Sequence, residues 1–165
     1  MFKVGVYLRY GSRGIFQVRG IQRRLLKTGL TADFYVLTSV FGVSTQIITP
    51  ISNLQLKPVM TRAEVEQVLD QISTVSMEWI DDKHLREETC RKALEEGDGL
   101  NLAALIKMLY LQKQQKLKEH KDLSRADSEA FRKAEELLRE EISLSLGIAP
   151  DQVHDYIVSR LQERS

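Results

Sequence analysis

The alternation of apolar and polar residues divides the chain into a strand-rich first third and a helix-rich remainder. Apolar residues occupy every second position from Phe2 to Leu8, the period of a half-buried strand. Further strands are predicted over 15–26, 34–41 and 45–49, where β-branched and aromatic residues lie between glycine-containing turns. Gly20, inside the second run, is expected to mark a bulge or bend. Strands this short and numerous predict a small barrel or a strongly bent sheet.

From Pro58 onward the apolar residues recur at helical spacing, and the chain contains residues typical of helix ends. Thr61 and Glu64 have the spacing of a capping box. Gly97 and Gly147 are expected to end helices. Helix starts are expected at Thr61, at Asp81 or Asp82, at Asp98, at Ser124 and at Pro150. The helix after Asp98 is expected to bury Leu102, Leu105, Ile106, Leu109 and Tyr110 and to end near Leu111.

These elements predict an α+β protein with two domains. Residues 1–58 are expected to form a small β barrel, and residues 59–165 an all-α bundle of about five helices.

The charge is divided at the same boundary. Residues 1–58 contain eight basic residues and one acid, Asp33, for a net charge of +7, whereas residues 59–165 contain 16 basic and 22 acidic residues, for −6. The formal net charge of +1 therefore conceals a basic module joined to an acidic one. A basic surface attracts polyanions or acidic protein surfaces, which favours a two-part binding protein over a single enzymatic domain.

The amino-acid composition indicates which broad class of protein the chain belongs to. With 42% hydrophobic and 28% charged residues, the 165-residue chain is typical of globular proteins. The apolar runs are much shorter than the roughly 20 residues that span a bilayer, so no membrane partner is expected. The strand-like start predicts that no secretory signal is present. Cys90, the only cysteine, has no internal disulfide partner, which fits a reducing cytoplasm.

Catalytic and metal-binding patterns are not found in the sequence. His84, His120 and His154 each lie apart from other residues at metal-ligand spacing. The turn 11–14 lacks phosphate-loop spacing and precedes a strand rather than a helix. We therefore expect no enzymatic activity, cofactor, metal or small-molecule substrate.

The acidic second half contains one basic run. Its members are Lys107, Lys113, Lys116, Lys118, Lys121 and Arg125. These cations are suited to contacting successive phosphates of a DNA duplex. The alternative is a solvated helix end, which the helix dipole favours for basic residues.

Trp79 is the only tryptophan and precedes the second expected helix. A core or staple role is the ordinary interpretation for such a residue. The alternative is an apolar wedge that enters between base steps in a minor groove.

Taken together, these pieces resemble the CarD family of bacterial transcription regulators. The similarity includes the opening Met1–Gly5, the turn 11–14, the strand 34–37, and the segments 48–53 and 56–65. It continues through Glu95–Asp98, 105–111, 134–138 and Leu146–Ile148, so it covers nearly the whole chain.

The resemblance implies a Tudor-like N-terminal domain that binds the β subunit of bacterial RNA polymerase. It also implies a helical domain that touches promoter DNA at the upstream edge of the melted bubble and alters open-complex stability. The protein would then be cytoplasmic and associated with the nucleoid through polymerase. Polymerase contacts are implied around Arg23, Arg24, Ile47 and Ile48, and a DNA wedge at Trp79. The other DNA contacts, at Lys113, Lys116, Lys118, Lys121 and Arg125, are expected from the charge of the basic run.

The chain also departs from the family pattern. Ile48 stands where relatives carry a basic residue, and Trp79 lies about one helical turn farther from the Gly97–Asp98 pair than the family's wedge tryptophan. The alternative function is an RNA- or ribosome-associated factor, because small basic β barrels also bind RNA.

Overall fold

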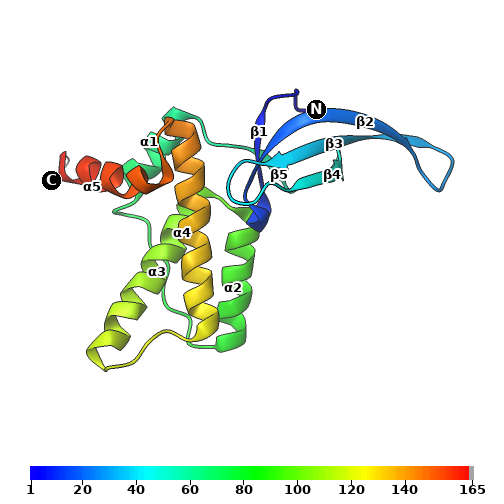
Figure 1. Cartoon of the computed structure of the whole chain (residues 1–165). Helices are drawn as coiled ribbons and strands as arrows, with labels where there is room; N and C mark the ends of the chain where they lie inside the picture. Colours follow the sequence, from blue (N-terminus) through cyan, green and yellow to red (C-terminus); the bar gives the residue numbers. More distant parts are fainter. Residues whose placement is uncertain (164–165) are drawn as a thin grey trace. The chain divides into compact units, whose positions relative to one another are not determined.

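The computed structural model describes residues 1–163 of the chain (Figure 1). These residues fall into two compact units, the first spanning Met1–Val59 and the second beginning at Met60. The first unit is a β-sheet and the second is helical, so the protein is of mixed α and β class, as the sequence predicts. No helix within residues 1–163 is both long and apolar enough to cross a membrane.

The first unit is a five-stranded antiparallel sheet. The strands follow the order β4-β3-β2-β1-β5, and β4 and β5 lie at the two edges. In the described part of the chain the sheet is open, so the predicted closed barrel is not confirmed. The strands are β1 (Tyr7–Tyr10), β2 (Ile15–Leu25), β3 (Thr31–Ser39), β4 (Gln46–Pro50) and β5 (Leu56–Pro58).

The prediction of a strand from Phe2 is wrong, because β1 begins only at Tyr7. A turn over Lys3–Val6 precedes it, closed by a hydrogen bond from the Val6 amide to the Lys3 carbonyl. Gly5 has a φ of 95°, a conformation that glycine adopts without a steric penalty. Val4 is consequently exposed rather than buried. The apolar residues do alternate here, but the turn at Gly5 prevents the backbone from being extended before Tyr7.

The bulge in β2 is where the sequence predicts it. The register between β2 and β3 shifts between Val18 and Gly20. Before the shift, β2 contributes Phe16 and Val18 to a core that also contains Tyr35 and Leu37. Beyond it, every residue from 21 to 30 is exposed. The far part of the β2–β3 hairpin therefore extends past the packed core of its own sheet, as the long curved ribbon in Figure 1 shows.

The second unit contains five α-helices within residues 60–163, the number predicted. They are α1 (Arg62–Gln71), α2 (Lys83–Glu96), α3 (Gly99–Lys118), α4 (Arg125–Leu146) and α5 (Val153–Glu163). A 3₁₀ turn over Pro150–Gln152 leads into α5. The two longest helices, α3 and α4, pack against each other, and α1, α2 and α5 pack around α4 (Figure 1).

Local side-chain chemistry sets most helix ends as predicted. The side chains of Thr61, Asp82, Asp98 and Ser124 each accept a hydrogen bond from an amide in the first turn of α1, α2, α3 and α4. Gly97 and Gly147 end α2 and α4 in the left-handed conformation. The choice between Asp81 and Asp82 is thereby settled in favour of Asp82.

The expected end of the third helix near Leu111 is wrong. Helix α3 continues to Lys118, because 112–118 contains no glycine or proline and consists of good helix formers. His120 then adopts a φ of 59°, and the Lys121 amide bonds the Lys116 carbonyl. Tyr110, expected to be buried, is exposed, whereas Leu105 and Leu109 are buried.

A buried carboxylate ties the start of the second unit to its longest helix. Glu141 of α4 is fully buried, and its Oε2 accepts a 2.7 Å hydrogen bond from the Met60 amide. The Ser145 hydroxyl donates to the Met60 carbonyl at 2.6 Å. Met60 in turn packs with Val65, Leu102 and Ile142 in the helical core. The entry of the chain into the bundle is therefore fixed by polar and apolar contacts together.

Candidate functional site

The four residues implied as polymerase contacts lie on two different faces of the sheet. Ile47 pairs with Leu37, which belongs to the core, and is itself half-buried against that core. Ile48 pairs with Val36 on the opposite face and is 39% exposed. Because side chains alternate across a strand, Arg23 shares the Ile47 face and Arg24 shares the Ile48 face.

Contacts within the hairpin support this division. The Arg23 Nε donates to Asp33 Oδ1 at 3.1 Å, across the β2–β3 pair. Arg24 donates from Nε and Nη2 to Gln22 Oε1 at 3.3 and 3.0 Å, and its guanidinium carbon lies 6.0 Å from the centre of the Phe34 ring. Arg24, Phe34 and Ile48 thus form one surface, here called the Arg24 face.

The end of the same hairpin carries apolar side chains beside its charges. Leu25 is 74% exposed and Leu30 is 70% exposed, and both flank the turn that contains Lys27. The sequence analysis recognised the charge of this segment but not the exposure of its leucines. Apolar residues beside basic residues on a protruding element are typical of a protein-binding surface.

Trp79 lies in the connection between α1 and α2, where it is half-buried and packs against the helical core. The guanidinium carbon of Arg86 lies 4.5 Å from the centre of its ring, a cation–π contact. Trp79 therefore has features of both a core residue and an accessible wedge. Its ring rests on the buried Arg86, and part of its side chain stays accessible.

Arg86 connects Trp79 to the start of α4. Arg86 is buried, with 8% of its surface exposed, and its Nε donates to Asp127 Oδ1 at 3.0 Å. Its Nη1 donates to the carbonyls of Ile80 and Asp81 at 2.9 and 3.3 Å. Asp127 is two residues from Arg125, so Trp79 and the basic run share one end of the helical unit.

Several residues of the basic run gather at that end. Lys113, Lys116 and Lys118 lie in the last turns of α3, Lys121 in the following loop, and Arg125 is the first residue of α4; these five are here called the basic strip. Figure 1 shows α2 and α4 beginning at the same end of the bundle, towards which α3 runs. The starts of α2 and α4, capped by Asp82 and Ser124, lie at this end as well.

Other contacts modify the predicted run. The Lys107 ammonium donates to the carbonyls of Ile72, Ser73 and Val75, at 3.2, 3.3 and 2.7 Å, so it has a structural role at the end of α1. Arg125 forms an exposed ion pair with Glu129, with 3.2 Å between Nε and Oε1. Lys113 lies over Phe131, with 5.8 Å between its Nζ and the ring centre.

Two arginines that the sequence analysis missed lie near one member of the strip, and one of them, Arg132, is paired with Glu136. Lys113 of α3 lines a hollow of about 280 Å³ together with Arg132 and Arg139 of α4, and Glu135 is the acid among its lining residues. Arg132 and Arg139 are seven residues apart on one face of a single helix. That spacing was visible in the sequence, but only the packing of α3 against α4 brings Lys113 to them.

Cys90 is a buried thiol on α2. Burial, and secondarily the nearby Asp127 carboxylate, raises the pKa of Cys90 to about 11. We expect iodoacetamide to alkylate the folded chain at pH 8 about 100-fold more slowly than the urea-unfolded chain, because only the thiolate reacts. The folded-state rate should rise about tenfold per pH unit until the pH approaches 11. Equal rates for the folded and unfolded chains would contradict this burial.

No protein-family model matches the chain, and no curated protein sequence matches it.

Proposed function

We propose that the chain is a CarD-like bacterial transcription regulator. In this proposal the β unit is a Tudor-like domain that binds the polymerase β subunit through the Arg24 face. The helical unit contacts promoter DNA near the upstream edge of the bubble through Trp79 and the basic strip, and thereby alters open-complex lifetime. The support from sequence is the resemblance and the division of charge.

One structural observation carries the proposal: Trp79 is held beside the basic strip. A half-buried aromatic residue on a fixed arginine is pre-positioned, and its loop is anchored by the Arg86 bonds to Ile80 and Asp81. The lysines of the basic strip are suited to phosphate contact. Many minor-groove proteins insert an apolar side chain between base steps while other residues contact the phosphates, and this arrangement supports such a role for Trp79.

The net acidity of the helical half shapes this mechanism. Repulsion between its acids and DNA offsets the basic strip, so affinity of the free chain for duplex DNA is low and independent of sequence. Binding to polymerase raises the local concentration of the helical unit at the promoter, which makes the weak DNA contact productive. The charge difference between the two halves thus favours binding to polymerase first and contact with promoter DNA second.

The two arginines of the hairpin provide a matched test. Arg24→Glu is expected to weaken binding of the full chain to purified polymerase β subunit by about 100-fold, because like charges facing each other across an interface cost several kcal/mol. Arg23→Glu makes the same change in net charge on the opposite face and is expected to have a much smaller effect. Binding is measured by calorimetry, after circular dichroism has shown an intact sheet.

Two outcomes would contradict the assignment. Unchanged binding for both variants would refute a polymerase contact through this hairpin. Equal losses for both would indicate attraction to net charge rather than docking of the Arg24 face. If the chain retains ribosomal proteins or RNA from lysate and not the β subunit, the RNA-binding alternative is favoured.

A further inference from the structure

A hollow of about 200 Å³ lies in the helical unit where α3, α4 and α5 meet the end of α1. Most of its lining is aliphatic, from Ile72, Ala103, Ile106, Leu138, Ile142, Val153 and Ile157. Three of these, Ile72, Ile106 and Ile157, are only half-buried, so a ligand in the hollow can reach them. An aliphatic cavity of about 150 Å³ is large enough to hold benzene, so this hollow suits a short branched alkyl group.

Two side chains of opposite charge line this hollow without pairing. Glu135 and Arg139 lie one turn apart on α4, the spacing at which a carboxylate and a guanidinium commonly form an ion pair. Within residues 1–163, neither forms a hydrogen bond or an ion pair. Arg139 opposes the rise in the pKa of Glu140 that burial causes, but does so without an ion pair. Glu135 and Arg139 are therefore available to the charged groups of a ligand.

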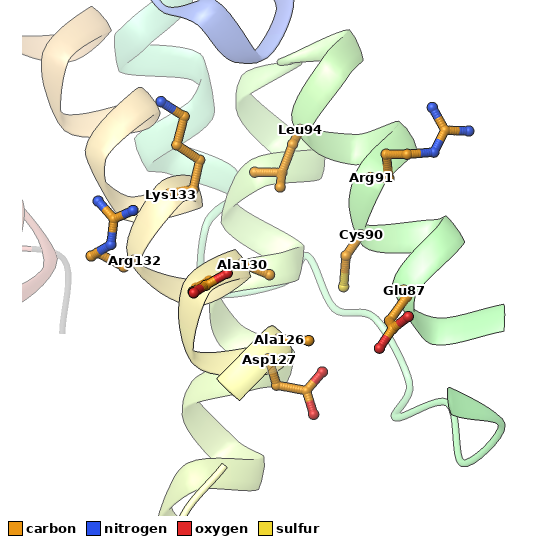
Figure 2. Close-up of a pocket in the computed structure, with 10 residues that line it drawn as sticks. Glu87, Cys90, Arg91, Leu94, Ala126, Asp127, Ala130, Arg132 and Lys133 are labelled. Carbon is orange, nitrogen blue, oxygen red and sulfur yellow. The ribbon is translucent and has the colours of Figure 1, made fainter. Parts of the chain in front are cut away.

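Other charged residues of the helical unit are paired. Arg132 and Glu136, on the same helix and at the same spacing, form an ion pair. A larger hollow of about 380 Å³ lies between α2 and α4 (Figure 2), but most of its charged lining residues have partners within the protein, among them Arg91 and Asp127. The smaller hollow instead combines an unpaired carboxylate and an unpaired guanidinium, one turn apart, with an aliphatic lining.

The other polar residues of the smaller hollow are Lys107 and His154. The Lys107 ammonium donates to three carbonyls at the end of α1, so its donors are used and it fixes that wall. His154 is exposed near the start of α5. Glu135 and Arg139 also line the hollow that contains Lys113, so the two hollows adjoin along α4, and the aliphatic lining is on the α5 side.

We propose that this hollow binds a small aliphatic α-amino acid as its zwitterion. The ammonium group donates to the Glu135 carboxylate, the ligand carboxylate accepts from the Arg139 guanidinium, and the alkyl side chain packs on Ile72, Ile106 and Ile157. The two charged groups of an α-amino acid are attached to one carbon, which suits partners a single helical turn apart. Each charge that leaves water gains a partner of opposite sign. The proposal does not depend on polymerase or DNA binding.

The test is a titration of the full chain, labelled at its isoleucine methyl groups, with L-leucine. We expect saturable shifts at Ile72, Ile106 and Ile157, and none at Ile48 of the β unit. Isocaproate lacks the ammonium group of L-leucine and isoamylamine lacks its carboxylate. Each loses one charged hydrogen-bonding group, so each should bind at least about tenfold more weakly. L-Alanine keeps both charges but has little alkyl surface to bury, and should also bind at least about tenfold more weakly.

Variants assign each charge of the ligand to its partner. Glu135→Gln should weaken binding of L-leucine about tenfold and should not weaken binding of isocaproate, which has no ammonium group. Arg139→Gln should weaken binding of L-leucine to a similar extent and should not weaken binding of isoamylamine. The matched controls are Glu129→Gln and Arg132→Gln, the same changes on α4 outside this hollow, and neither should alter the affinity. Circular dichroism checks that each variant is folded.

Three results would overturn the proposal. The first is the absence of saturable methyl shifts up to the solubility limit of L-leucine. The second is binding of isocaproate and isoamylamine as tight as that of L-leucine, which would indicate an apolar hollow indifferent to charge. The third is an equal effect of Glu135→Gln and Glu129→Gln on the affinity for L-leucine, which would indicate a response to the net charge of α4 rather than a contact with Glu135.

Discussion

Arg86→Met is expected to lower the free energy of unfolding by about 3–5 kcal/mol, the cost of leaving one member of a buried ion pair without its partner. Asp127 would stay buried, at 2% exposure, and lose its only side-chain donor in the described residues. The carbonyls of Ile80 and Asp81 would lose the same arginine. Urea unfolding followed by circular dichroism measures the effect, since Trp79 fluorescence would itself respond to the substitution.

The double substitution Arg86→Met with Asp127→Leu is the matched control. Replacing both partners with apolar side chains removes the uncompensated charge, so most of the lost stability should return. Arg91→Met, which breaks exposed pairs on the same helix, should cost less than about 1 kcal/mol. A loss of that small size for Arg86→Met would mean that water reaches Asp127 in solution.

Trp79→Ala is expected to have two separate effects. Loss of the ring over Arg86 should cost about 2 kcal/mol of stability, less than the 3–5 kcal/mol typical of a fully buried aromatic residue. If the proposed function is right, the lifetime of open promoter complexes should also fall at least about tenfold, a change of about 1.4 kcal/mol. Urea unfolding and the decay of promoter complexes measure the two effects on one variant.

Trp79→Phe is the control for Trp79→Ala, because it keeps an aromatic ring at this position. A phenyl ring still covers Arg86 and is of a type that enters base steps, so stability and complex lifetime should both be largely kept. A loss of 3 kcal/mol or more for Trp79→Ala would assign the residue to the core. An unchanged complex lifetime in the folded variant would remove Trp79 from the DNA contact and leave the basic strip.

Features set by neighbouring residues were predictable from the sequence. The bulge at Gly20, the aspartate and serine caps and the glycine helix ends each depend on a few adjacent positions. The strand expected over 34–41 is observed over Thr31–Ser39, and the two larger errors in element bounds are also local in origin. Alternation from Phe2 suggested a strand that the turn at Gly5 prevents, and charge after Leu111 suggested a helix end that lysine and glutamine do not impose.

Features that depend on distant residues were not predictable. Arg86 and Asp127 are 41 positions apart, and neither carries a local signal of burial. The same holds for Lys113, Arg132 and Arg139, which meet only because α3 and α4 pack together. The closure of a sheet likewise depends on strand curvature and on which edges meet, and strand count alone suggested a barrel where the sheet is open.

The projecting β2–β3 hairpin has a consequence for how the β unit opens. Because residues 21–30 are all exposed and none belongs to the core around Val18 and Leu37, the cross-strand hydrogen bonds there can break without exposing that core. Amide hydrogens near the tip should therefore exchange with solvent by local fraying, at rates nearly independent of low denaturant, whereas those of β2 before Gly20 should require opening of the whole sheet. A partner that clamps the Arg24 face would slow exchange selectively in the outer segment.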